Sequence, residues 1–453
     1  MTEEKNTLPR GEGKNDLYIG VRNDLSPFYV DLEALTRGLV IVGQSGCGKS
    51  FLIGRVVEEI VRKTTEKTRI LVIDSNSDFC GDLKLKPDEM FEKKCLNSYN
   101  SGSLKDREFD VFKEREQQYF DALKSFSPLP IGQLFGREEQ FNLSWEWLVS
   151  DSDRFVQVVK ADTYSIGYRL ALLNVVGKIK SEYESNSLGW TKAAMELSEV
   201  RSGPVDYLEY LKDRNLIAPK GFDVGDCLEL TIDLENELNA GVWSESVGEV
   251  GFPERLFLDS RINFMEVETI ANKKSRLKTV ACFLIHCLDE HRDLTEEYRD
   301  SRAEENDQSI TEAEQQLRHT FILIDEAQNY APEETNDPHE KMLGELIHTI
   351  AAEGRKYGLH VILATQRPNK IKRGLLGECD NAIIMKMNSR SDLEHLAREM
   401  RILDVKLLEP CLHFQGQGNA LAVGEMTRMA PYVQLFKSAP RRTREGGVDI
   451  PGF

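Results

Sequence analysis

The chain lacks any apolar run long enough to cross a membrane. No stretch of its 453 residues approaches the roughly 18 uninterrupted apolar residues that a membrane-spanning helix needs. The first six residues, Met-Thr-Glu-Glu-Lys-Asn, have no apolar core and do not resemble a secretory signal. These absences argue against an exported or membrane-anchored protein, and we expect a cytoplasmic one.

Cysteines at the spacing of a metal site or redox motif are also missing. The eight cysteines are scattered, with no C-x-x-C pair and no histidines at zinc spacing. Cys282, His286 and Cys287 share a stretch of predicted helix, where we expect core residues rather than metal ligands. The pattern fits a reducing compartment.

Excess positive charge is absent as well. Lys and Arg number 58 against 76 Asp and Glu, which gives a net charge of −18. A basic footprint over the whole surface is therefore excluded, and any DNA must be bound through a local basic lining such as a ring channel.

No Asn-Lys-x-Asp segment, the motif that reads guanine, occurs in the chain, which disfavours a GTPase. With 40% hydrophobic and 30% charged residues, the chain is typical of a globular protein of about two to four domains.

A phosphate-binding loop is the strongest positive signal. Residues 43–50 match G-x-x-x-x-G-K-[ST] at every fixed position. An apolar run at 38–42 precedes them, and helical spacing from Phe51 to Arg62 follows. Such a loop turns its N–H groups onto phosphates, while Lys49 reaches the β- and γ-phosphates and the Ser50 hydroxyl ligates Mg²⁺. The alternative is a Gly/Ser turn that happens to hold a lysine. We predict an ATP site with Mg²⁺, formed by Gly43, Gln44, Ser45, Gly46, Cys47, Gly48, Lys49, Ser50 and Phe51.

Three further apolar strands end in polar residues. Arg69–Asp74 ends in the carboxylate of Asp74, and Phe321–Ile324 is followed by Asp325 and Glu326. In a nucleotide hydrolase, Asp325 would hold Mg²⁺ and Glu326 would polarise the attacking water. A buried strand ending in Asp-Glu can also be purely structural.

The third strand, His360–Thr365, leads into Gln366. This amide would reach the γ-phosphate or the lytic water; alternatively it satisfies loop carbonyls. Just upstream, Arg355 would lie near a phosphate of its own site or of a neighbour's, where a guanidinium suits the charge of the transition state.

The pattern along the chain predicts four parts. Residues 1–37 form a short N-terminal β segment with strands at 17–21 and 28–32. Residues 38–80 and 226–440 form the ATPase core, with strands at 228–232 and 261–265 and a helix at 274–291. Residues 81–225 form a mainly helical insertion, with a helix at 153–179, and residues 441–453 form a tail. We expect residues 289–318 to be a solvated helix end and flexible loop.

The motif set resembles the HerA/FtsK family of hexameric DNA-pumping ATPases, and the HerA branch most closely. Besides residues 43–50 it comprises Asp74, Asp325-Glu326-Ala327-Gln328, residues 354–358, residues 364–368 and the later residues 388–392. The resemblance covers roughly residues 15–80 and 225–440. It implies an α/β fold with a RecA-like P-loop NTPase core, a homo-oligomeric ring with double-stranded DNA in its channel, and a partner nuclease or other effector in DNA-end processing or defence against phage.

Residue roles follow from the resemblance too. Arg37 takes the place of an arginine inserted into a neighbouring subunit's site, and Arg355 that of a second nucleotide-contacting arginine. Asp74 matches an acidic residue near the nucleotide, and Gln366 a polar sensor. The tail would lie across the adjacent protomer. HerA proteins usually carry an N-terminal β-barrel of about a hundred residues, whereas only some 37 residues precede the loop here, and the insertion is longer and more acidic than expected.

The most basic short stretch near the core is residues 367–373. Facing a channel, Lys370, Lys372 and Arg373 would contact DNA phosphates without reading sequence; otherwise the stretch is a solvated loop. A second hypothesis is an ATP-dependent ring scaffold that activates or restrains a partner enzyme without DNA transport. The acidic balance and the missing barrel favour this alternative.

Overall fold

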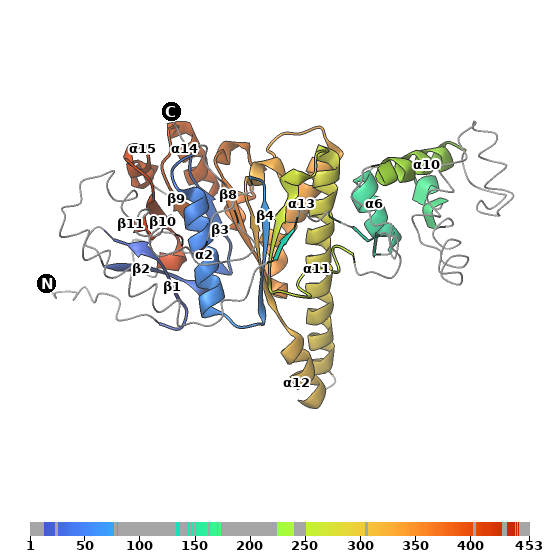
Figure 1. The fold of residues 1–453 in the computed structure, drawn as a ribbon, viewed down its shortest axis with the longest axis horizontal. Helices are drawn as coiled ribbons and strands as arrows, with labels where there is room; N and C mark the ends of the chain where they lie inside the picture. The colour runs from blue at the N-terminus through green and yellow to red at the C-terminus, as the bar shows by residue number, and fades with distance from the viewer. Residues whose placement is uncertain are drawn as a thin grey trace.

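The computed structural model describes residues 13–22, 26–76, 79, 133–135, parts of 141–173, 224–239, 251–303, 307–401, 405–427, 433–439, 441 and 443. Their strands form one eleven-stranded sheet with helices on both faces (Figure 1). In order across the sheet the strands are β2 (Pro27–Asp31), β1 (Asp16–Val21), β11 (Val433–Ser438), β10 (Asn419–Val423), β9 (Asn381–Ile384), β3 (Leu39–Val42), β8 (Leu359–Thr365), β7 (His319–Ile324), β4 (Thr68–Asp74), β6 (Ile262–Glu266) and β5 (Gln133–Phe135).

The direction of the strands gives the sheet two distinct edges. Every neighbouring pair from β9 to β5 is parallel, while β10, β11, β1 and β2 are joined by antiparallel pairing. We call the edge where the parallel strands end the carboxyl edge, and the edge where they begin the amino edge. Ligands of α/β sheets bind outside the carboxyl edge.

The core lies in two layers, one on each face of the sheet. The described helices are α1 (Leu32–Leu35), α2 (Lys49–Lys63), α6 (Ser152–Lys160), α10 (Val224–Asn239), α11 (Lys273–Ala303), α12 (Asp307–Gln316), α13 (Pro338–Glu353), α14 (Arg390–Glu399) and α15 (Pro410–His413). Leu39 and Ile41 of β3 pack with α2, whereas Val40 and Val42 pack on the layer of α11 and α13. In Figure 1, β4 stands between α2 and α11. Strands buried on both faces are continuously apolar, which is why these four residues formed such a clear signal.

The predicted N-terminal strands are confirmed, and they extend the main sheet. β1 pairs with both β2 and β11. Helix α2 is tied to β1 by two buried side chains, because Glu59 accepts a hydrogen bond from the Tyr18 N–H at 2.8 Å and Arg55 Nε donates to the Tyr18 carbonyl at 3.1 Å.

The strand predicted at 228–232 is wrong, since these residues lie within α10. Leu228, Leu230 and Ile232 alternate as in a strand, but the described side chains follow a helix: Leu230 is 1% exposed and Ile232 is 47% exposed, while Glu237 two turns later is 3% exposed. Positions two apart lie on opposite faces of a helix, and positions seven apart lie on the same face.

Two helical predictions also need correction. The flexible loop expected in 289–318 is wrong over much of its length, because α11 continues to Ala303 and α12 follows. Of the α12 residues only Ala313 is buried, so a solvated helix was mistaken for a loop. The helical pattern expected over 153–179 is interrupted after Lys160, where Ala161 takes a left-handed conformation with φ of 50°, and residues 166–169 and 171–173 are helical again. Residues beyond 173 lie outside the described residues.

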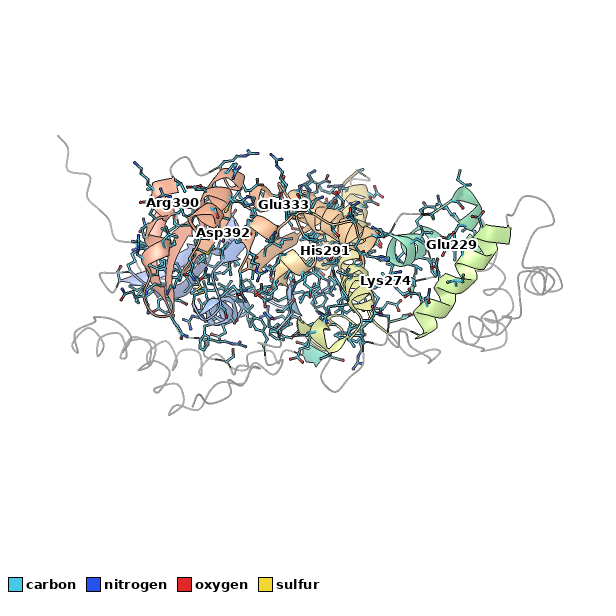
Figure 2. The ribbon with its side chains drawn as sticks, turned by 90° about the horizontal axis from the view of Figure 1, so that it is seen from above. Glu229, Lys274, His291, Glu333, Arg390 and Asp392 are labelled. Atoms are coloured by element: carbon cyan, nitrogen blue, oxygen red, sulfur yellow. The ribbon has the colours of Figure 1, made fainter. Side chains whose placement is uncertain are left out.

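The insertion contributes to the sheet as well as to the helices. Strand β5, from within residues 81–225, adds in parallel to β6 at the end of the sheet. Figure 2 shows Glu229 of α10 and Arg390 of α14 at opposite ends of the molecule.

Within the described part of the chain, no helix combines the length and apolar character that a membrane crossing requires.

Candidate nucleotide site

The phosphate loop joins β3 to α2 at the carboxyl edge, as predicted. Gly46 and Gly48 have φ of 76° and 98°, a backbone region that residues with a Cβ rarely occupy. Helix α2 begins at Lys49 with no side-chain cap and no acidic residue in its first turn. The end of a helix without such a cap presents N–H groups and a positive dipole, which together favour an anion.

Backbone groups that are distant in sequence form hydrogen bonds with this loop. Gly43 N–H donates to the Thr365 carbonyl of β8 at 3.2 Å, and Gln44 N–H donates to the Lys386 carbonyl after β9 at 3.1 Å. On the other side, Gly418 N–H donates to the Cys47 carbonyl at 2.8 Å. Sequence patterns alone do not point to Lys386 or Gly418, although glycines at 416 and 418 precede a strand.

Two carboxylates from the end of β7 meet the loop lysine. Lys49 Nζ lies 2.7 Å from Glu326 Oε1 and 3.2 Å from Asp325 Oδ1, and all three side chains are buried. Burial alone would lower the pKa of Lys49, but the adjacent Asp325 and Glu326 outweigh it and raise that pKa. Although burial acts to raise the pKa of Glu326, the Lys49 ammonium and neighbouring amides hold it below the ordinary range. Both Glu326 and Lys49 are therefore charged at neutral pH.

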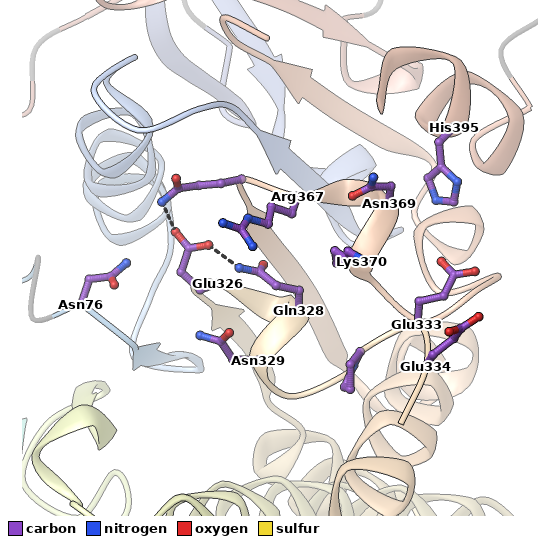
Figure 3. Close-up of a pocket in the computed structure, with 12 residues that line it drawn as sticks. Asn76, Glu326, Gln328, Asn329, Glu333, Glu334, Arg367, Asn369, Lys370 and His395 are labelled. Atoms are coloured by element: carbon purple, nitrogen blue, oxygen red, sulfur yellow. Dashed lines mark hydrogen bonds between the residues drawn. The ribbon is translucent and has the colours of Figure 1, made fainter. Parts of the chain in front are cut away.

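Two amides fix the orientation of Glu326, as Figure 3 shows. Gln366 Nε2 donates to Glu326 Oε1 at 2.5 Å, and Gln328 Nε2 donates to Oε2 at 2.7 Å. Thr365 Oγ1 in turn donates to Gln328 Oε1 at 2.7 Å. Glu326 itself has a φ of 49°, a left-handed conformation that costs on the order of 1–3 kcal/mol in a residue other than glycine. Gln328 belongs to the Asp-Glu-Ala-Gln motif of residues 325–328, but its contact with Glu326 was not predicted from the sequence.

Asp74 lies at the end of β4, fully buried, and shapes the turn that follows it. Its carboxylate accepts hydrogen bonds from the N–H groups of Asn76 and Phe79, both at 3.0 Å. Asn76 Nδ2 donates to Asp325 Oδ2 at 3.0 Å, and Ser75 Oγ donates to the Asp325 carbonyl at 2.8 Å. These contacts favour a positioning role for Asp74, acting on Asp325 through its own turn.

A cavity of about 810 Å³ opens beside Glu326. Its walls include Asn76, Gln328, Gln366, Arg367, Lys370 and Glu333. Figure 3 shows the labelled lining residues around Glu326. The predicted catalytic carboxylate is thus open to a space large enough for a polar ligand, at the edge where the strands place it.

The predicted arginines lie at the opposite, amino edge. Arg37 precedes β3 and forms ion pairs with Asp380 at 3.6 Å and Glu425 at 3.4 Å. Arg355 is exposed in the short helix η4 (Gly354–Tyr357), just before β8. A seven-residue strand such as β8 separates the two edges by about 20 Å. Neither arginine is therefore brought to the phosphate loop of its own chain.

The basic stretch is divided between two surroundings. Lys370, in η5 (Pro368–Lys370), lines the cavity, and Arg373 is exposed. Lys372 instead places its Nζ 2.6 Å from Glu345 of α13. The three predicted DNA contacts thus share no single environment.

The start of the tail packs on its own chain. Arg441 is buried, with its guanidinium 5.0 Å above the ring of Phe79, and Thr443 N–H donates to Glu58 of α2 at 2.7 Å. For these two residues the expectation of a tail lying across the neighbouring protomer is wrong. The rest of the tail lies outside the described residues.

Two family models match the parts of the chain that contain the phosphate loop and the Asp-Glu strand. Residues 17–124 match the family model "Helicase HerA, central domain", and residues 267–387 match "ATPase family associated with various cellular activities (AAA)". The DNA double-strand break repair helicase HerA of Pyrococcus furiosus is 24% identical over 28% of this chain, and that of Sulfurisphaera tokodaii is 31% identical over 26%. The match spans only 22% and 23% of those relatives' length.

Some matches extend over nearly the whole chain. The probable helicase MJECL08 of Methanocaldococcus jannaschii is 20% identical over 93% of this chain and 70% of its own. The plasmid coupling protein TrwB superposes with a TM-score of 0.48 at 11% identity, covering 97% of this chain and 93% of that chain, a likeness too weak to support an argument. The phosphate loop and the Asp-Glu strand thus occur in a chain that is similar, over part of its length, to the HerA central domain and to AAA ATPases, which supports an ATP-hydrolysing P-loop enzyme.

Proposed function

We propose that this chain hydrolyses ATP and uses the energy to move double-stranded DNA through a ring of identical subunits. The observation that carries the proposal is the carboxylate of Glu326, held between Lys49 and two amides beside a cavity at the carboxyl edge. The six-fold ring, the DNA and a partner nuclease or other effector, in DNA-end processing or phage defence, belong to the proposal. Relatives named as DNA double-strand break repair helicases support it.

The residues present fit a magnesium nucleotide. A Cβ added to Gly46 would meet nothing within 4 Å, so the mouth of the loop is open, and the uncapped start of α2 favours phosphate. Ser50 and Asp325 would hold Mg²⁺, which when bound supplies charge neutralisation at the phosphate oxygens.

Lys49 links nucleotide binding to the activation of Glu326. Phosphate oxygens compete with the carboxylates for the Lys49 ammonium. As Lys49 turns toward phosphate, Glu326 loses its cationic partner, so its pKa rises and it becomes a stronger base. Gln328 and Gln366 still hold it in place to orient and deprotonate the attacking water.

We assign Arg37 and Arg355 to the pocket of a neighbouring subunit. Their place at the amino edge keeps them from their own loop, and in a ring that edge can face the next subunit's carboxyl edge. Arg37→Ala alone and Glu326→Gln alone should each be inactive. A mixture of the two should recover turnover, because the Glu326→Gln subunit lends an intact Arg37 to an intact pocket.

The outcomes of this mixing experiment are distinct. Recovered ATP hydrolysis supports a site shared between subunits. Full activity of Arg37→Ala alone, or no recovery on mixing, would contradict it.

A scaffold that assembles on ATP without transporting DNA is the second candidate. The net charge of −18 and the pairing of Lys372 with Glu345 favour it. Linear duplex DNA should stimulate ATP hydrolysis by a translocase, and Lys370→Ala with Arg373→Ala should reduce that stimulation. A scaffold would show no stimulation by DNA. Identification of proteins that co-purify with the chain would test the partner.

A further inference from the structure

Three histidines, His291, His319 and His360, lie at the amino edge, outside the nucleotide site. His360 of β8 is buried against His319 of β7, with His319 Nδ1 2.9 Å from His360 Nε2 and the two rings stacked. His360 Nδ1 lies 3.1 Å from the Thr36 carbonyl. His291 of α11, labelled in Figure 2, has Nδ1 2.7 Å from the Tyr357 carbonyl and Nε2 2.8 Å from Thr320 Oγ1.

The acceptors fix the tautomers of two of these rings. A carbonyl only accepts, so Nδ1 must carry the proton in both His360 and His291. In a neutral ring the other nitrogen then accepts, from His319 Nδ1–H in one case and from the Thr320 hydroxyl in the other. Burial lowers the pKa of His291, and burial with the nearby His319 lowers the pKa of His360 to about 3. Both rings are neutral at pH 7.

Each of these carbonyls adjoins one of the two arginines. Thr36 directly precedes Arg37, and Tyr357 closes the η4 turn that carries Arg355. Backbone bonds also hold the Arg37 turn, from Arg37 N–H to the Ala34 carbonyl at 3.1 Å and from Asp380 N–H to the Arg37 carbonyl at 3.0 Å. From β9, Asn381 Nδ2 donates to the Ala34 carbonyl at 2.8 Å and to the Gly38 carbonyl at 3.1 Å. His360 is thus the side chain of β8 that hydrogen-bonds to the backbone next to Arg37, at the Thr36 carbonyl. His291 of α11 likewise hydrogen-bonds to the backbone of η4, at the Tyr357 carbonyl.

We propose that His360 and His291 are positioning residues: their Nδ1–H groups set the backbone from which Arg37 and Arg355 reach a neighbouring subunit. This inference rests on the shared site proposed above. It assigns the histidines a role in the neighbour's pocket and none in their own.

Two amide replacements of similar polarity separate this role from general core packing. In His360→Asn the amide can stand where Nδ1 stood and still donate to Thr36. In His360→Gln the amide reaches the Nε2 position instead, and the Thr36 bond is lost. We expect His360→Gln to lower kcat by about 10- to 100-fold, as a misplaced reacting group does, with the dissociation constant of a non-hydrolysable ATP analogue unchanged. His360→Asn should recover most of the activity.

Mixing shows whose pocket is affected. His360→Gln mixed with Glu326→Gln should recover turnover to the extent that Arg37→Ala mixed with Glu326→Gln does. His348→Gln makes the same change in a histidine of α13 that is not one of the three histidines at the amino edge. It serves as the matched control and should leave turnover unchanged.

The results that would overturn the inference differ from those that would overturn the shared site. Equal activity of His360→Asn and His360→Gln, or failure of mixing to rescue His360→Gln while it rescues Arg37→Ala, removes the positioning role alone. Failure to rescue Arg37→Ala removes the shared site itself. If His360→Gln does not fold, His291→Asn and His291→Gln make the same comparison at the Arg355 turn.

Discussion

Glu326 is the residue on which the proposed chemistry depends, and its surroundings are unusually constrained. It takes a left-handed backbone conformation, carries a charge that burial disfavours, and is held by one ammonium and two amides. Such strain and charge burial persist where function requires them.

Removal of the carboxylate should separate binding from chemistry. Glu326→Gln keeps the size and hydrogen bonding of the side chain but cannot accept a proton, so we expect kcat to fall by roughly 10²- to 10⁴-fold. ATP binding should persist. Lys49→Ala should lose both binding and turnover, and calorimetric titration with a non-hydrolysable analogue distinguishes the two variants.

The two amides should act on kcat without affecting affinity. If Lys49 turns to phosphate as proposed, Gln328 and Gln366 are the remaining partners of the Glu326 carboxylate among the described contacts, and they would keep it aimed at the water. Gln328→Ala and Gln366→Ala should each lower kcat on the order of tenfold to a hundredfold, with the analogue's dissociation constant unchanged. Asn369→Ala removes an amide from the same cavity wall that is not bonded to Glu326 among the described contacts, and it serves as the control. Unaltered kcat in both glutamine variants would contradict the assignment.

Buried histidines make the folded state sensitive to acid. The pKa of His360, lowered to about 3 by burial and His319, lies below the 6.5 of an exposed imidazole. The unfolded chain therefore binds more protons between these values, and stability is full above pH 6.5 and is lost as pH falls toward 3. Thermal unfolding from pH 7 to pH 4 should show Tm falling, and His360→Asn should flatten the slope. An identical slope in both proteins would show that His360 is not the group responsible.

Helix α2 joins the phosphate loop to the N-terminal strands. Glu59, which is fully buried, accepts hydrogen bonds from Tyr18 N–H of β1 and from Arg62. Glu59→Ala leaves both donors without this acceptor, so we expect a loss of about 3 kcal/mol in the free energy of unfolding. Chemical denaturation measures it, and Glu33→Ala, a change at an exposed glutamate of α1, is the control.

Elements with a strong local pattern could be predicted from the sequence. The phosphate loop, β4, β7 and β8 each combine a continuous apolar run with a polar end, a pattern that needs no long-range knowledge. Residues 228–232 could not be assigned from five positions because both periods fitted, and α12 has almost nothing to bury. Gln328, Asn76 and Gly418 could not be assigned roles because their partners are set by the order of strands across the sheet.

At the scale of the whole molecule, the site and its proposed arginines lie at opposite edges of one sheet. In the proposed ring, a single chain would hold one half of each of two pockets, and activity would depend on assembly. The central claim is that each working pocket is built by two copies.

The most direct test is ATP turnover per chain across a dilution series, with the mass of the assembly measured at each concentration. We expect turnover to rise steeply over the concentrations where the ring forms and to be close to zero for the separated chain. A monomer that hydrolyses ATP at full rate at every dilution would contradict the claim.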